Sequence, residues 1–216
     1  MHAQYAKKIL LVEGIDDQKV VEKLLKRRKI VFDDFAVNNC EGVQKLFNIL
    51  PAAVSVGSYD VLGLIVDADE DMAARWNAVR NILLNAGYDK ILANPASKGI
   101  IVEDENEELP KIGIWMMPDN RMKGAIEDFI RFLVPEKDDL LPIAEKKVDR
   151  LIADGKNRFS VSQRSKAVIH TWLAWQERPG KQIGSAVTYR LETKEYLLDD
   201  KKAGDFVSWL KNVFSP

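Results

Sequence analysis

The chain has 216 residues, of which 46% are hydrophobic and 30% are charged, a composition typical of a folded globular protein and not of a disordered one. Its 32 basic and 33 acidic side chains nearly cancel, so no overall positive field attracts nucleic acid, and such a partner would have to meet a local patch or bound metal ions. One cysteine and two histidines exclude an intrachain disulfide and a thiolate zinc cluster.

The first 86 residues alternate between short apolar runs and amphipathic segments. The runs KILLVE and VLGLIV are continuous apolar stretches, which is typical of strands buried on both faces. Val20, Val21 and Leu24 repeat with the period of one helical face. The predicted strands are 8–13, 30–37 and 61–66, and the predicted helices are 17–28, 42–50 (which ends before Pro51) and 72–86.

Two more strands are expected, at 100–102 and 112–116, and we interpret the acidic run 103–108 between them as a solvated loop. A helix at 124–133 ends before Pro135, and the pattern then becomes helical, at 140–152, 165–175 and 205–214. The alternation predicts an α/β fold with a mostly parallel sheet and helices on both faces. Residues 1–135 would form this domain, and 136–216 would form a mainly helical extension packed on it.

Three acidic residues stand where the buried strands end. Glu13 closes the first strand, and Asp67 and Asp69 follow the third. Ligands of open α/β sheets gather at the carboxyl ends of the strands, and residues two apart on an extended segment point to the same side. Because clustered carboxylates repel one another, they need a cation, and oxygen ligands select Mg²⁺ or Mn²⁺ over zinc. Such a site suits phosphoryl transfer.

The same residue types also have a purely structural interpretation. An acid after a strand can cap the next helix or form a turn. Asp16 and Asp17, near the start of the first helix, fit capping better than catalysis, although Asp17 stays a candidate. An Asp-x-Asp pattern alone is a weak signal.

Two strings together resemble the motifs of the Toprim domain family. LLVEGIDD, from Leu10 to Asp17, is similar to its first motif, and LIVDADED, from Leu64 to Asp71, is similar to its second. The resemblance covers residues 8–86 and extends more weakly to 133. It implies a Rossmann-like sheet, with Glu13 as an acid/base or metal ligand, Asp67 and Asp69 as the metal-binding pair, and Gly14 at the turn.

Two candidates come from the second half of the chain. The segment 117–129 resembles the part of small stand-alone Toprim-related proteins and of overcoming-lysogenization-defect (OLD) nucleases where another glutamate joins the site. This implies Glu127, with Asp119 as a weaker candidate and Asp128 as the weakest, whereas an ordinary acid at a helix start is the alternative for Glu127. Lys166 could supply the positive charge that phosphoryl transfer uses, or it could lie on a basic helix start whose other face is core.

We therefore expect a Mg²⁺- or Mn²⁺-dependent phosphoryl-transfer enzyme, of nuclease type, with DNA or RNA as its partner. The alternative is a non-catalytic module that binds metal or nucleic acid, and whether a partner protein completes a site stays open. A receiver domain ranks last, because the first strand ends Val12-Glu13-Gly14 and not in aspartates. No P-loop motif occurs. No apolar run matches a membrane span or a signal peptide, so the expected location is the cytoplasm.

Overall fold

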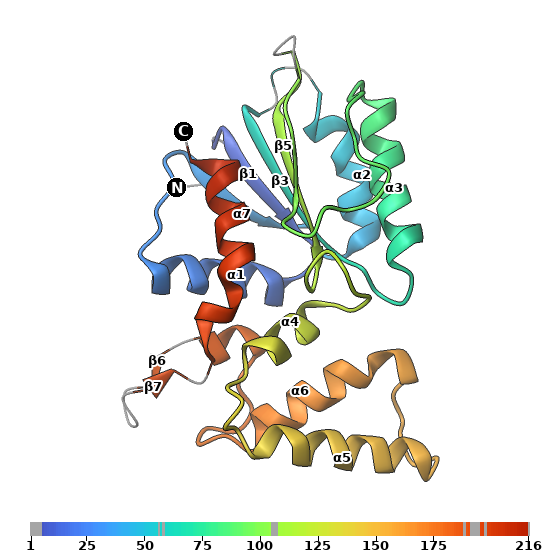
Figure 1. Cartoon of the computed structure of the whole chain (residues 1–216), viewed down its shortest axis with the longest axis vertical. Coiled ribbons are helices and arrows are strands. Elements are labelled where there is room, and N and C mark those ends of the chain that lie inside the picture. The colour runs from blue at the N-terminus through green and yellow to red at the C-terminus, as the bar shows by residue number, and fades with distance from the viewer. Residues whose placement is uncertain are drawn as a thin grey trace.

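The computed structural model describes residues 6–55, 57, 59–104, 108–187, 189–190, 195–196 and 198–215 (Figure 1). The main elements are β1 (Lys8–Val12), α1 (Ile15–Arg28), β2 (Phe35–Asn39), α2 (Val43–Ala53), β3 (Val61–Asp67), α3 (Met72–Asn85), β4 (Ile100–Val102), β5 (Lys111–Met117), α4 (Ile126–Leu133), α5 (Leu140–Ala153), α6 (Arg164–Ala174) and α7 (Gly204–Phe214). Among the described residues, no helix has both the length and the apolar character that a membrane crossing requires.

The central sheet has five strands in the order β2-β1-β3-β5-β4, and only β4 is antiparallel to its neighbour. From β1 the chain moves outward to β2 and then returns to place β3 on the other side of β1. This reversal makes the carboxyl ends of β1 and β3 the topological switch point, which is where doubly wound sheets bind ligands. The predicted α/β fold with a mostly parallel sheet is confirmed.

Helices cover both faces of the sheet, with α1 and α7 on one face and α2 and α3 on the other (Figure 1). Side chains alternate between these faces, since Leu10 and Val12 pack in the core that includes α1 and α7, whereas Ile9 and Leu11 pack with α2 and α3. Helix α7 lies very close to the strands: a Cβ at Gly113 would stand 2.3 Å from Val213 Cγ2.

The C-terminal segment separates into two parts in space. Helices α5 and α6 lie with α4 beyond the carboxyl ends of the strands, whereas α7 returns to the sheet (Figure 1). Between them, the short strands β6 (Tyr189–Arg190) and β7 (Glu195–Tyr196) pair antiparallel, and the sequence pattern did not predict them. Helices α5 and α6 therefore cover the edge of the sheet at which the predicted site lies.

Some predicted boundaries were wrong. Strand β2 begins at Phe35 and not at residue 30, because Asp34 has a φ of 53° and its side chain and carbonyl bind the backbone of Lys7 and Lys8. Helix α2 continues to Ala53 and contains Pro51 in its last turn, at the cost of one backbone hydrogen-bond donor. In the acidic run, residues 105–107 lie outside the described residues, and Asp104 accepts hydrogen bonds from the backbone of Glu108 and Leu109.

Candidate functional site

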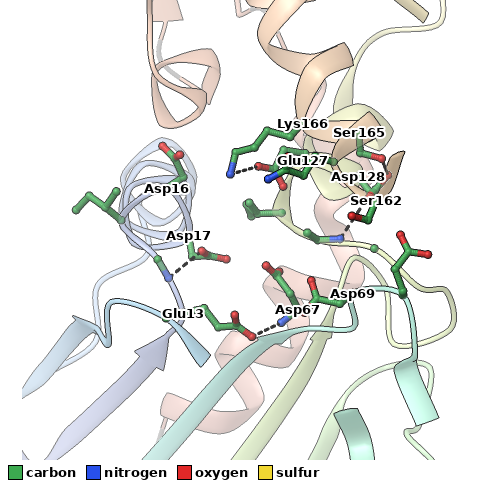
Figure 2. Close-up of a pocket in the computed structure, with 18 of the residues that line it drawn as sticks. Glu13, Asp16, Asp17, Asp67, Asp69, Glu127, Asp128, Ser162, Ser165 and Lys166 are labelled. Atoms are coloured by element: carbon green, nitrogen blue, oxygen red, sulfur yellow. Dashed lines mark hydrogen bonds and ion pairs between the residues drawn. The ribbon is translucent and has the colours of Figure 1, made fainter. Parts of the chain in front are cut away.

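A pocket of about 960 Å³ lies at the switch point, between the ends of β1 and β3 and the first turns of α1, α4 and α6. Nine carboxylates and two lysines are among its lining residues. Figure 2 shows that Glu13, Asp17, Asp67 and Glu127 point toward a common space, each from a different element or loop. The acids line the pocket as follows: Glu13, Asp16, Asp17, Glu41, Asp67, Asp69, Glu70, Glu127 and Asp128.

Glu13 joins the two strand ends. It follows β1 directly, and its Oε1 accepts a hydrogen bond from the backbone N–H of Asp67 at 2.9 Å. Burial raises the pKa of Glu13 to about 7, against the lowering effects of that hydrogen bond and of Arg75. A glutamate with a pKa near neutrality can either hold or release a proton under physiological conditions.

Asp17 both caps a helix and faces the pocket. Its Oδ2 accepts the N–H of Gly14 at 3.1 Å, which stabilises the start of α1. Its Oδ1 is buried without a hydrogen-bond partner, and the residue is only 4% exposed. Burial, followed by the charge of Glu13, raises the pKa of Asp17 to about 7. The capping interpretation therefore accounts for only one of its two oxygens.

Asp67 is the last residue of β3. Like Asp17, it has a buried Oδ1 without a hydrogen-bond partner. Burial, followed by the charges of Asp17 and Glu13, raises the pKa of Asp67 well above its ordinary value. Carboxylates that raise one another's pKa in this way form a site where a cation would be strongly stabilising.

Asp69 also lines the pocket, but the expected extended geometry from Asp67 to Asp69 is wrong. Strand β3 ends at Asp67, and Asp69 has a φ of 50°. Its backbone exchanges two 2.9 Å hydrogen bonds with Gly124, and its carboxylate forms an ion pair with Arg75. The turn toward α4 therefore sets the direction of Asp69, and strand alternation does not.

Glu127 and Lys166 meet at the roof of the pocket. Glu127 is in the first turn of α4 and only 6% exposed, and Lys166 Nζ on α6 lies 3.2 Å from its Oε1 (Figure 2). The pKa of Lys166 is raised, first by the charge of Glu127 and also by Asp16 and Asp67. Packing of α6 on α4 thus brings two separately predicted residues into one pocket.

Two further predicted residues have different places. Gly14 lines the pocket at the turn between β1 and α1. Asp119 is not one of the lining residues, and its Oδ1 accepts the backbone N–H groups of Arg121 and Met122 at 3.0 and 2.9 Å. Asp119 therefore shapes the turn after β5.

Sequence reasoning missed several lining residues or gave them little weight. Asp128 and Ser165 form a hydrogen bond of 2.6 Å on the roof, and Lys123 forms an ion pair with Glu70 on the rim. The pattern around Asp16 indicates only a helix-start acid. No local pattern marks Ser165 or Lys123, because their place depends on contacts between segments far apart in the sequence.

The pocket offers carboxylate oxygens as ligands, which suit Mg²⁺ or Mn²⁺ and not a soft metal. As the side chains stand, no three acids, histidines or cysteines of the described residues are arranged to hold a metal ion. Asp69 is turned to Arg75, and Glu127 to Lys166. The unpartnered Oδ1 atoms of Asp17 and Asp67 still fit a cation, because burial makes such atoms unfavourable without one.

The fold and this pocket define a class of protein: a doubly wound α/β protein with an acidic, roofed pocket at the topological switch point. The chain belongs to the family described as "Protein of unknown function (DUF3226)", whose profile matches residues 7–215. No curated protein and no solved structure gave a match.

Proposed function

We propose that this protein is a Mg²⁺- or Mn²⁺-dependent phosphoryl-transfer enzyme, a nuclease-type Toprim protein that acts on nucleic acid. The observation that supports it most is the group Glu13, Asp17 and Asp67, in which two buried oxygens have no partner and all three pKa values are raised. Buried carboxylates with unpartnered oxygens and raised pKa values are typical of functional sites and are rare in ordinary capping.

The residues divide into distinct roles. Asp67 and Asp17 would hold the metal with their unpartnered oxygens. When bound, the metal would polarise the phosphoryl group and stabilise charge on the attacking and leaving oxygens. Glu13 would accept or return a proton at the oxygen that does not bind the N–H of Asp67. Lys166, whose side chain is 56% exposed, would donate to a phosphate oxygen while Glu127 holds it in position.

Purified protein should cleave single-stranded DNA, plasmid DNA or RNA with Mn²⁺ or Mg²⁺, and chelation should stop the cleavage. Asp67→Asn keeps the shape of the side chain but removes its charge, so we expect a loss of about 100-fold or more. Asp119→Asn is the matched control, because it removes the same charge outside the pocket and Asn suits turns equally well.

Two results would reject the proposal. Cleavage that is equal in Asp67→Asn and the wild type would belong to a contaminant. No cleavage of any of the three substrates with either metal would remove the nuclease function.

A second candidate is a non-catalytic module that binds metal or nucleic acid. The ion pairs of Asp69 with Arg75 and of Glu127 with Lys166 favour it, since they occupy two of the carboxylates that the sequence predicted as metal ligands. Calorimetric titration with Mn²⁺ separates the two candidates: the module predicts binding that depends on Asp67 without cleavage.

A further inference from the structure

Three lysines gather beside the acidic pocket, and we call Lys19, Lys23 and Lys181 the lysine cluster. Lys19 and Lys23 are one helical turn apart on the same side of α1. The segment with Lys181 runs directly into η3 (Ile183–Val187), a 3-10 helix that packs on α1. Contact here is tight, because Lys19 donates a hydrogen bond to the Gln182 side chain and its Cβ lies 2.5 Å from the position a Cβ on Gly184 would take.

The cluster concentrates positive charge on one side of α1. Burial, and then the charges of Lys19 and Lys181, lower the pKa of Lys23, and only Glu22 acts in the opposite direction. Glu22 itself accepts a 2.8 Å hydrogen bond from Gln18. Within the described part of the chain, none of the three lysines forms an ion pair.

Other lysines around the pocket behave differently. Lys45 pairs with Glu41, Lys123 with Glu70, and Lys166 with Glu127. Each of these three cations thus has an acid of the protein as its partner. Lysines that converge without an ion-pair partner destabilise one another by repulsion, and an anion from outside would relieve this repulsion.

Two lysines of the cluster lie on α1 beyond the end of that helix that lines the pocket. Asp16 lines the pocket in the first turn of α1, and at 1.5 Å per residue Lys19 and Lys23 follow it by about 4.5 and 10 Å along the helix axis. A nucleic-acid strand has one phosphate per roughly 3.4 Å of rise. The cluster can therefore meet the first to the third phosphate beyond one placed in the pocket.

We propose that the lysine cluster binds the phosphate backbone of a nucleic-acid strand that enters the acidic pocket from the α1 side. The inference rests on the proposed function for the nature of this ligand. A strand fits better than a small anion, because only an extended ligand can occupy the pocket and contact the lysine cluster at the same time. The cluster supplies affinity and position, and it takes no part in the chemical step.

Binding should be measured without divalent metal, so that it is independent of cleavage. The probe is a short fluorescein-labelled single-stranded DNA, followed by fluorescence anisotropy in EDTA between about 50 and 200 mM salt. The variant is K19Q/K23Q/K181Q. The matched control is K146Q/K147Q/K211Q, which removes the same charge from exposed lysines that do not line the pocket.

We expect the cluster variant to bind at least about tenfold more weakly at low salt, and the slope of log K against log salt to fall by about 2, as for three lost phosphate contacts at about 0.7 each. The control should stay within about twofold of the wild type. Equal losses in both variants, or no binding by the wild type, would overturn the inference. Circular dichroism and gel filtration of each variant exclude misfolding as the cause of a loss.

Different results would reject the phosphoryl-transfer function and the strand-binding role of the lysine cluster. Lysine-dependent binding without cleavage under any metal condition would reject the phosphoryl-transfer function and keep the strand-binding surface. Metal-dependent cleavage that the cluster variant performs with an unchanged KM, together with unchanged binding in EDTA, would reject the surface and keep the enzyme.

Discussion

The first turns of α1 and α4 carry the same capping arrangement with opposite outcomes. Asp17 and Asp128 each occupy the third position of their helix, and each accepts a backbone N–H just before it, from Gly14 at 3.1 Å and from Ala125 at 3.0 Å. The second oxygen of Asp128 accepts the Ser165 hydroxyl at 2.6 Å, whereas that of Asp17 is buried without a partner.

This difference distinguishes two aspartates that occupy the same position of a helix. Capping needs a single carboxylate oxygen, and in Asp128 the protein provides for the other one as well. In Asp17 it leaves the other oxygen buried near Glu13 and Asp67, at the carboxyl ends of β1 and β3. A helix cap does not require this second buried acceptor, and the proposed cation site rests on it.

The sharpest contrast is expected in metal binding. Asp17→Asn keeps the cap through its amide oxygen but removes the charge, so Mn²⁺ affinity should fall by at least about tenfold. Asp128→Asn should change it by no more than about twofold. Calorimetric titration with Mn²⁺ measures both, and equal losses in the two variants would break the comparison.

The pH dependence of stability follows from the raised pKa values. Glu13 and Asp17 have ordinary values of 4.5 and 3.8 and values of about 7 in the folded protein, so the folded state keeps protons that the unfolded chain releases. Their contribution is complete below those ordinary values and is lost as the pH rises through about 7. The Tm of the metal-free protein should therefore fall between pH 5 and pH 8.

Asp17→Asn should flatten this fall and should raise the Tm at pH 8 by about 3 °C or more, since one kcal/mol corresponds to about 2–4 °C for a chain of this size. Added Mg²⁺ should stabilise the wild type more at pH 8 than at pH 5, because it replaces the lost protons. Calorimetric scans of both proteins test this, and a Tm of the metal-free wild type that rises toward pH 8 would contradict the assignment.

Removal of the satisfied cap should have an ordinary structural effect. Asp128→Ala removes the acceptor for the Ala125 N–H and for the Ser165 hydroxyl, which should cost about 1–2 kcal/mol. The expected signature is a lower denaturation midpoint than that of the wild type at the same pH. An unchanged midpoint would contradict the role of Asp128 as a cap.

The smallest effect is expected from Ser165→Ala. It removes one hydrogen bond on the roof of the pocket and should lower stability by about 0.5–1.5 kcal/mol. Urea denaturation detects a change of this size, and Ser162→Ala, which alters another serine of the pocket lining, is the matched comparison. A loss above that of Asp128→Ala would show that Ser165 has a further partner.

Local patterns predicted the strand ends well and the roof poorly. The run KILLVE ends in Glu13, and the run VLGLIV is followed directly by Asp67. The sequence alone therefore places these two acids at one edge of a parallel sheet. It does not give the direction of Asp69, because a positive φ at a residue other than glycine leaves little sequence signal. The raised pKa of Asp17 depends on its burial and on the charges of Glu13 and Glu127, and Glu127 belongs to a helix in the second half of the chain.

A crystal structure with Mn²⁺ tests most directly whether Asp17 and Asp67 bind a divalent cation beside Glu13. Anomalous scattering should show a peak in the pocket within about 2–2.5 Å of carboxylate oxygens of both Asp17 and Asp67. A well-ordered pocket without such a peak at saturating Mn²⁺, or a peak bound only by surface acids, would contradict the account.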